Sequence, residues 1–296
     1  MKYLLITIFL LGMTLSVSSQ GKELDNTFYC FNNGVRDLPN APEKLEDQVA
    51  LIKKLGFDGL AGHNTQNNTA LRAELNKSGL QMPEVYYGMT MDESGFISYP
   101  DDLLEFIEDS RGKNLLVALT LTAENQMAKE KKTDKLFVEA IKALANHAAM
   151  FDVEIALYPH VNLYLEESMH SVELAMAVDM ENVGVVFNTC HFLKVEGEEG
   201  WAEKLEQTLP FLRMVSINGA DSGDTKNMGW DQLIQPLGEG SFDTYKLVKL
   251  LKDKGYNGLF GLQCYGIQQD CEVALGKSIL SWKTYQKKYV SEAPIP

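Results

Sequence analysis

The chain has 296 residues, of which 45% are hydrophobic and 23% charged, and its formal net charge is −14. Such an acidic surface repels a phosphate backbone, so these values argue against binding to DNA or RNA. The length permits one large α/β barrel or two small domains, and either can bury a sizeable core.

Residues 1–19 have the pattern of a secretory signal peptide. Lys2 precedes an almost wholly apolar run at residues 4–15, and the small residues Val17 and Ser19 follow it. The run is too short for a comfortable membrane-spanning helix. We therefore expect an exported protein, periplasmic or extracellular, that is soluble and free of the membrane once residues 1–19 are removed. Residues 20–296 are expected to form one domain.

Short apolar runs alternate with longer amphipathic stretches along the rest of the chain. Strands are expected at residues 28–31, 57–62, 82–89, 115–121, 153–157, 183–187, 211–217 and 259–262. Helices are expected at residues 42–55, 65–77, from about 100, 133–150, 167–178, 198–208, 242–254 and 270–287. Eight strand–helix units in a chain of this size predict the α/β class and a (β/α)8 TIM barrel. An open doubly wound sheet is the alternative, but no strand is followed by a glycine-rich dinucleotide turn.

The carboxyl ends of barrel strands converge on one mouth, so polar residues that follow different strands can meet there. Three of the five histidines of the sequence follow predicted strands. Tyr86 and Tyr87 point to opposite faces of their strand, so at most one of them faces the barrel interior. The candidate residues at the strand ends are Asn32, His63, Tyr86, Tyr158, His160, Asn188, His191, Asn218, Asp221, Gln263 and Tyr265.

The second half of the chain resembles the sugar phosphate isomerase/epimerase superfamily, the xylose isomerase-like barrels that include endonuclease IV. Asn188-Thr-Cys-His191 stands where that family has Asp-Thr-Gly-His, and the family's Pro-Leu-Gly-Glu-Gly turn is intact at residues 236–240. Tyr158-Pro-His160 and Asn218-Gly-Ala-Asp221 correspond to the ends of the family's fifth and seventh strands. The resemblance is close over residues 153–266.

The resemblance implies a divalent metal (Mn, Mg or Zn) held by Glu, Asp, His and Glu. The equivalent positions here are neutral: Tyr158, Asn188, Asn218 and Gln263. Each lost charge pair at ~4 Å removes roughly 4 kcal/mol of attraction at an effective dielectric constant near 20. We therefore expect no standard metal site and no other cofactor. If a metal binds nonetheless, His160 or His191 would be its ligand.

The resemblance implies a carbohydrate isomerase, epimerase or lyase that removes a proton next to a carbonyl. Export and the lack of an arginine cluster favour a non-phosphorylated sugar or glycoside as the small-molecule partner. His63, His160 or His191 would be the general base, oriented by Asp221. The expected substrate-binding residues are Asn32, Tyr86, Tyr158, Asn188, Asn218, Trp230, Gln263 and Tyr265.

A non-catalytic exported sugar-binding barrel, which has lost the family's metal site, is the alternative function. Each candidate also has a purely structural interpretation: His191 could be a core histidine, and the amides could satisfy backbone groups of the barrel. The particular sugar and the oligomeric state are not predicted.

Cys30, Cys190 and Cys264 lie in or directly after strand-like runs, where buried free thiols are common. Since export permits disulfides, a bridge between Cys264 and Cys271 is the alternative.

Overall fold

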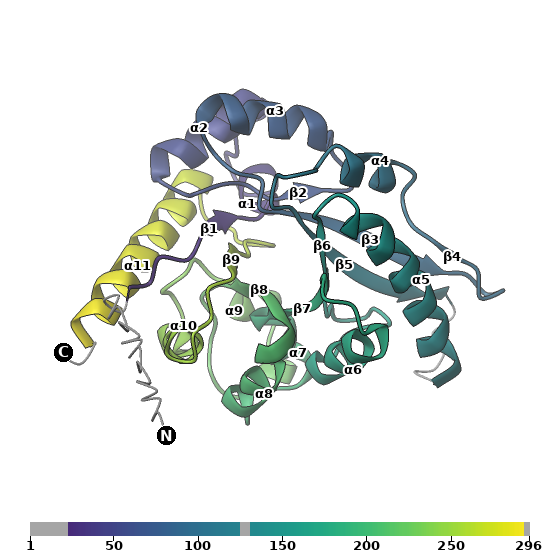
Figure 1. Cartoon of the computed structure of the whole chain (residues 1–296). Coiled ribbons are helices and arrows are strands. Elements are labelled where there is room, and N and C mark those ends of the chain that lie inside the picture. Colours follow the sequence, from purple (N-terminus) through teal and green to yellow (C-terminus); the bar gives the residue numbers. More distant parts are fainter. Residues whose placement is uncertain (1–22, 125–130, 293–296) are drawn as a thin grey trace, which may run out of the picture.

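The computed structural model describes residues 23–124 and 131–292, so the expected signal peptide lies outside the described residues. Eight parallel strands form the centre of the molecule (Figure 1). They are β1 (Phe28–Cys30), β2 (Gly62–His63), β3 (Glu84–Met91), β5 (Leu116–Ala123), β6 (Glu154–Leu157), β7 (Val183–Asn188), β8 (Leu212–Ile217) and β9 (Leu259–Leu262).

The strands are arranged in the order β1-β9-β8-β7-β6-β5-β3-β2, and all of these neighbours pair in parallel. Backbone contacts at the two ends of this order close the ring. Cys30 N donates to Gly59 O at 3.2 Å, and Ala61 N donates to Cys30 O at 2.9 Å. The predicted (β/α)8 barrel is therefore confirmed, and the open doubly wound sheet is not formed.

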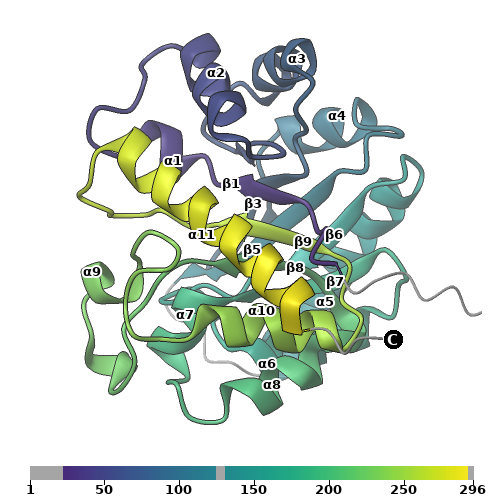
Figure 2. The ribbon, with the colours of Figure 1, turned by 90° about the vertical axis from the view of Figure 1, so that its left-hand side faces the viewer.

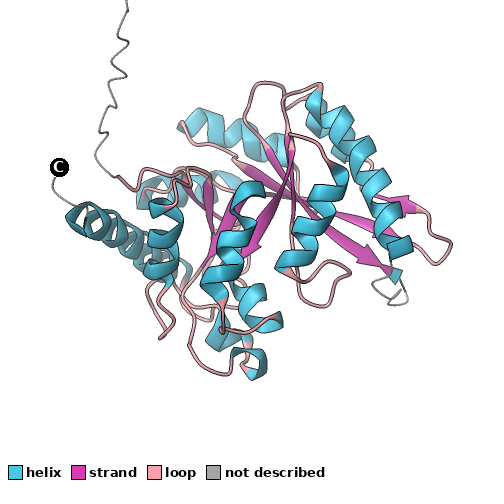
Figure 3. Ribbon diagram, turned by 60° about the horizontal axis from the view of Figure 1, so that its bottom comes forward, coloured by secondary structure: helices cyan, strands magenta, loops and turns pink. Residues whose placement is uncertain are grey.

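Helices cover the outside of the strands (Figures 1 and 3). The main ones are α2 (Leu45–Leu55), α3 (Asn68–Ser78), α4 (Asp102–Glu108), α5 (Lys131–Ala149), α6 (Ser168–Val178), α8 (Trp201–Thr208), α10 (Thr244–Asp253) and α11 (Cys271–Glu292). Helix α11 runs past β1 and α1 (Figure 2), and the ring of its Trp282 stacks on Phe28 with centroids 4.4 Å apart. The last helix thereby packs against the first strand. Among the described residues, no helix combines the length and the hydropathy that a membrane span requires.

Several short elements were not predicted, because one or two turns of helix are too short to show a period. They are α1 (Asn33–Arg36), α7 (Thr189–Val195), α9 (Trp230–Leu233), η2 (Leu209–Phe211), η3 (Thr225–Asn227) and the strand β4 (Ile97–Ser98). The stretch after β8, expected to be one long loop, contains η3 and α9. Strand β3 extends to Met91 because its end pairs antiparallel with β4.

Small and large side chains alternate across the barrel interior. Ala61, Ala118 and Ala156 leave space that Tyr29 and Phe31 fill. A Cβ atom at position 261 would collide with the Phe31 ring, so Gly261 is the residue that lets this ring cross the barrel. These side chains therefore fill the middle of the barrel interior.

The four cysteines, Cys30, Cys190, Cys264 and Cys271, are free and buried, as their positions predicted. Cys271 Sγ contacts Gly34 O at 3.2 Å in place of a bridge to Cys264.

Candidate functional site

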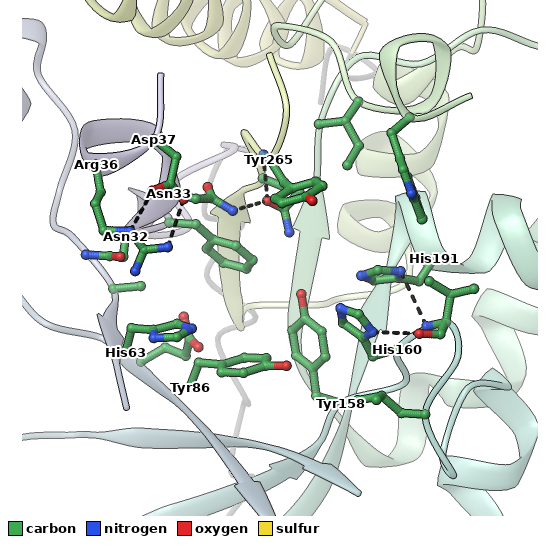
Figure 4. Close-up of a pocket in the computed structure, with 18 of the residues that line it drawn as sticks. Asn32, Asn33, Arg36, Asp37, His63, Tyr86, Tyr158, His160, His191 and Tyr265 are labelled. Atoms are coloured by element: carbon green, nitrogen blue, oxygen red, sulfur yellow. Dashed lines mark hydrogen bonds and ion pairs between the residues drawn. The ribbon is translucent and has the colours of Figure 1, made fainter. Parts of the chain in front are cut away.

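A cavity of about 510 Å³ lies at the carboxyl ends of the strands (Figure 4). Its volume is in the range of small-molecule sites, which is typically 300–1,000 Å³. Nine of the twelve predicted site residues line it: Asn32, His63, Tyr86, Tyr158, His160, His191, Trp230, Gln263 and Tyr265. The remaining three, Asn188, Asn218 and Asp221, do not line this cavity.

His160 and His191 form a pair on one side of the cavity (Figure 4). Their ring centroids are 4.0 Å apart. His160 follows β6 in a tight turn, in which Pro159 fixes the backbone and Asn162 adopts a positive φ of 64°. His191 lies in the first turn of α7, directly after β7. The turn and the short helix thus bring together two residues that are 31 positions apart.

The backbone of Val161 orients both rings. His160 Nδ1 lies 2.9 Å from Val161 O, and since a carbonyl only accepts, this nitrogen carries a proton. His191 Nδ1 lies 3.5 Å from the Val161 N–H, and since an amide only donates, this nitrogen carries a lone pair. In their neutral forms, His160 therefore has its free lone pair on Nε2, whereas His191 has its N–H on Nε2. The pair combines one acceptor with one donor.

Both histidines favour the neutral form. Burial lowers the pKa of His160, and burial together with the neighbouring His160 lowers the pKa of His191 well below its ordinary value. The edge of Trp230 packs on His191, with ring centroids 5.5 Å apart, and restricts solvent on that side. Neutral imidazoles are the state that a general base and a hydrogen-bond donor require near pH 7.

His63 and Tyr86 lie on the other side of the cavity (Figure 4), with their rings stacked at 5.2 Å and only 2° from parallel. His63 Nδ1 accepts from the Thr65 N–H at 3.2 Å, which leaves the proton of the neutral ring on Nε2. Burial and the nearby Arg36 guanidinium lower the pKa of His63. Tyr86 faces the cavity, whereas the Tyr87 hydroxyl bonds Asp102 Oδ2 at 3.0 Å among the helices, as alternation along the strand predicted.

The positions that the resemblance assigns to a metal are occupied by residues that bind one another or the backbone. Asn188 Nδ2 donates to the Tyr158 hydroxyl at 2.5 Å, and Asn188 Oδ1 accepts from Cys190 Sγ at 3.2 Å. Asn218 Nδ2 donates to two backbone carbonyls, each at 2.7 Å. Gln263 Oε1 accepts from Asn33 Nδ2 at 2.5 Å and from two backbone N–H groups.

This donor set does not fit a divalent metal, because it contains no carboxylate, and among its amide oxygens only Asn218 Oδ1 is without a partner in the described part of the chain. Within residues 23–124 and 131–292, no three His, Cys, Asp or Glu side chains lie close enough together to hold a metal ion. Asp221 was expected to orient one of the histidines. It lies half-buried after β8 and makes no hydrogen bond to His63, His160 or His191 among the described residues.

Three lining residues were missed from the sequence. Asn33 joins α1 to the end of β9 through Gln263. Arg36 and Asp37 form an exposed pair at the mouth, with Arg36 Nε 2.7 Å from Asp37 Oδ1. Asn33-Gly-Val-Arg36 forms α1, and a single turn of helix is too short to show a period in the sequence.

Glu84 was missed as well, and it is the buried carboxyl of the cavity lining. It is only 1% exposed, and it belongs to the same face of β3 as Tyr86. The sequence did contain a signal, since Glu84 precedes Tyr86 by two positions in a predicted strand. Asn32 Oδ1 is a further buried lining group without a hydrogen-bond partner among the described residues. An unpaired buried acceptor of this kind is suited to a hydroxyl-bearing ligand.

The fold and this cavity define an α/β barrel with a ligand site at the carboxyl ends of its strands. The chain belongs to the xylose isomerase-like TIM barrel family, whose model matches residues 49–279.

Among known proteins, the chain is similar to inosose isomerase of Halalkalibacterium halodurans, with 22% identity over 261 residues and 85% of each chain covered. It also resembles the solved structure of L-ribulose 3-epimerase, with a TM-score of 0.69, 14% identity and coverage of 89% of this chain and 95% of that chain. A third likeness is 3-keto-D-glucoside 4-epimerase from E. coli, with a TM-score of 0.66, 15% identity and coverage of 87% and 98%.

Proposed function

We propose that this protein removes a proton next to the carbonyl of a non-phosphorylated sugar or glycoside, and so acts as an isomerase, an epimerase or, with a leaving group on the next carbon, a lyase. The observation that carries this proposal is the pair of oppositely oriented neutral histidines, His160 and His191, on the cavity wall. The similar proteins are named as an isomerase and two epimerases, and this supports the proposal.

His160 Nε2 takes the proton from the carbon next to the carbonyl. Electron density then moves onto the carbonyl oxygen, and the Nε2–H of His191 donates a hydrogen bond to the resulting enolate. A donor placed where negative charge develops is worth about 3–4 kcal/mol of barrier in comparable sites. The single guanidinium among the described lining residues, Arg36, is paired with Asp37, which favours a neutral substrate over a sugar phosphate.

The reaction is tested by exchange of the proton α to the carbonyl in deuterated water. Inosose, L-ribulose and a 3-keto-D-glucoside are suitable probes. We expect His160→Gln to lower the exchange rate by at least about a hundredfold, the usual contribution of a general base. The matched control is His147→Gln, which lies on α5 outside the cavity. Exchange that is unchanged in His160→Gln would exclude His160 as the base.

His191 is tested separately, because a core histidine would be needed for folding rather than for the reaction. His191→Ala should abolish exchange while the free energy of unfolding stays within about 2 kcal/mol of the wild type. A variant that unfolds instead would show that His191 is structural.

A non-catalytic sugar-binding barrel is the second candidate, and the neutral family metal positions favour it. It predicts saturable binding of a sugar, measured by calorimetry, without proton exchange in any bound sugar.

We further propose that residues 1–19 direct export. The basic start and the apolar run support this proposal. Fractionation of cells that express the full chain tests it, and a protein that stays in the cytosol with residues 1–19 intact would contradict it.

A further inference from the structure

Glu84, the first residue of β3, lines the same cavity as the histidine pair. Side chains alternate along β3, so Glu84 points the same way as Tyr86. The Tyr86 ring packs edge-on against Tyr158, with centroids 5.4 Å apart, and Tyr158 lies beside His160 and His191 (Figure 4). Glu84 is 1% exposed and still lines the cavity, so that a ligand can reach its carboxyl.

The carboxyl of Glu84 has little support from the protein. Its hydrogen-bond partner is the Tyr29 hydroxyl, at 3.3 Å from Oε2, and no Lys, Arg or His is paired with it within the described residues. Its other oxygen, Oε1, has no hydrogen-bond partner there either. An isolated buried carboxyl is costly, and an apolar side chain at this position would avoid that cost.

Three phenols belong to the surroundings of this carboxyl: Tyr29 from β1, which bonds it, Tyr86 from the same face of β3, and Tyr158, which directly follows β6. Burial raises the pKa of all three, so they remain neutral. Burial also raises the pKa of Glu84 to about 8, and the Tyr29 hydrogen bond opposes this rise. Near neutral pH the carboxyl therefore holds a proton that it can release at modest cost.

We propose that Glu84 is the second acid–base group of the reaction and acts on the substrate face opposite His160, so that the enzyme inverts a carbon centre as an epimerase does. This inference rests on the proposed function. The observation behind it is that two proton carriers, Glu84 on β3 and His160 after β6, line one cavity.

The step is balanced as follows. The C–H bond breaks toward His160 Nε2, and the electron pair forms the enolate. A proton from the Glu84 carboxyl then bonds to the same carbon from the other face, the carbonyl re-forms, and Glu84 is left ionised. After the product leaves, His160 releases its proton to water and Glu84 takes one up, so no oxidant or metal is required.

Glu84→Gln keeps the shape and removes the acid. We expect epimer formation to fall by about a hundredfold or more, while His160-dependent exchange of the α-proton stays within about threefold of the wild type. Glu154→Gln is the matched control, because Glu154 is an exposed carboxylate that lies near Arg213 and does not line this cavity. Epimer formation by Glu84→Gln at the wild-type rate would overturn the inference and leave the proposed function intact.

The pH profile supplies a readout that a purely structural role would not move. Epimer formation should fall as the pH rises through about 8, where Glu84 loses its proton. Tyr29→Phe removes the hydrogen bond that lowers the pKa of Glu84, so this limb should move to higher pH. A limb at the same pH in Tyr29→Phe would contradict the assignment to Glu84.

Infrared difference spectra separate failure of this inference from failure of the proposed function. The wild type at pH 6 should show a protonated-carboxyl band that Glu84→Gln lacks, and saturating L-ribulose, inosose or 3-keto-D-glucoside should shift it. A band that shifts without any proton exchange would overturn the catalysis, whereas exchange without any shift would overturn the role of Glu84 alone.

Discussion

Val161 contributes no side-chain chemistry to the candidate site, but its peptide groups decide the protonation pattern there. Its carbonyl holds the proton of His160 on Nδ1, and its amide holds the lone pair of His191 on Nδ1. One residue thereby turns two identical imidazoles into a base and a donor. The side chain of Val161 can therefore be substituted without effect on the two histidines, as long as the backbone at this position stays in place.

Glu84 has a consequence for stability that does not depend on any substrate. Its pKa is about 8 in the folded protein and about 4.5 when exposed, so between these values the unfolded chain binds fewer protons than the native one. The free energy of unfolding should therefore fall as the pH rises from about 4.5 to about 8. Glu84→Gln lacks this penalty, so its free energy of unfolding should exceed that of the wild type by roughly 5 kcal/mol above pH 8.

Urea denaturation of the wild type and of Glu84→Gln at several pH values measures this difference. The two proteins should converge near pH 4.5. A gap that is constant with pH would show that Glu84 does not titrate in the folded state with a raised pKa.

At the scale of elements, the turn at residues 236–240 holds the end of β8. Gly219 and Gln235 exchange two backbone hydrogen bonds at 2.8 and 2.9 Å, and Phe242 N donates to Ala220 O at 2.8 Å. Gly240 has a φ of 81°, and a Cβ there would meet the backbone of Ala220. The turn shared with the family thus fixes the loop that carries Trp230 to the cavity.

Gly240→Ala should be more destabilising than the backbone angle alone requires. The positive φ costs about 1–2 kcal/mol for a residue with a Cβ, and the contact with Ala220 adds to it. Gly255→Ala is the control, since Gly255 has a φ of 85° and open space around it. Thermal unfolding should show a larger loss for Gly240→Ala. Equal losses would mean that the turn can move away from Ala220.

The whole barrel should be stable without a metal. The positions equivalent to the family's ligands are neutral and carry no carboxylate, so we expect that a chelator has nothing to remove. Elemental analysis of the purified protein should find no stoichiometric transition metal, and EDTA should leave the unfolding midpoint unchanged. A midpoint lowered by EDTA would contradict this.

The four cysteines test the packing of the whole molecule. All are buried, and burial raises the pKa of Cys190 to about 12 and that of Cys271 to about 11. A thiol reagent should therefore react slowly with the folded protein. After unfolding, all four thiols should react. If only two thiols react in the unfolded chain, the other two form a disulfide.

The amino-acid sequence by itself determined the barrel. Short apolar runs alternate with amphipathic stretches, and each of these patterns can be recognised from residues that are neighbours in the chain. It also placed His63, His160 and His191 near the mouth, since strand ends can be read from composition. The boundaries of α2 and β3 differed by a few residues, because caps and antiparallel pairing set them.

Only the tertiary structure decided which polar residues face the cavity. Asn188 and Asn218 follow strands just as Gln263 does, but their amides are used by Tyr158 and by backbone carbonyls. Glu84 is the first residue of its strand and nevertheless lines the cavity. Hydrogen-bond partners and burial depend on residues far away in the chain, and no local pattern contains them.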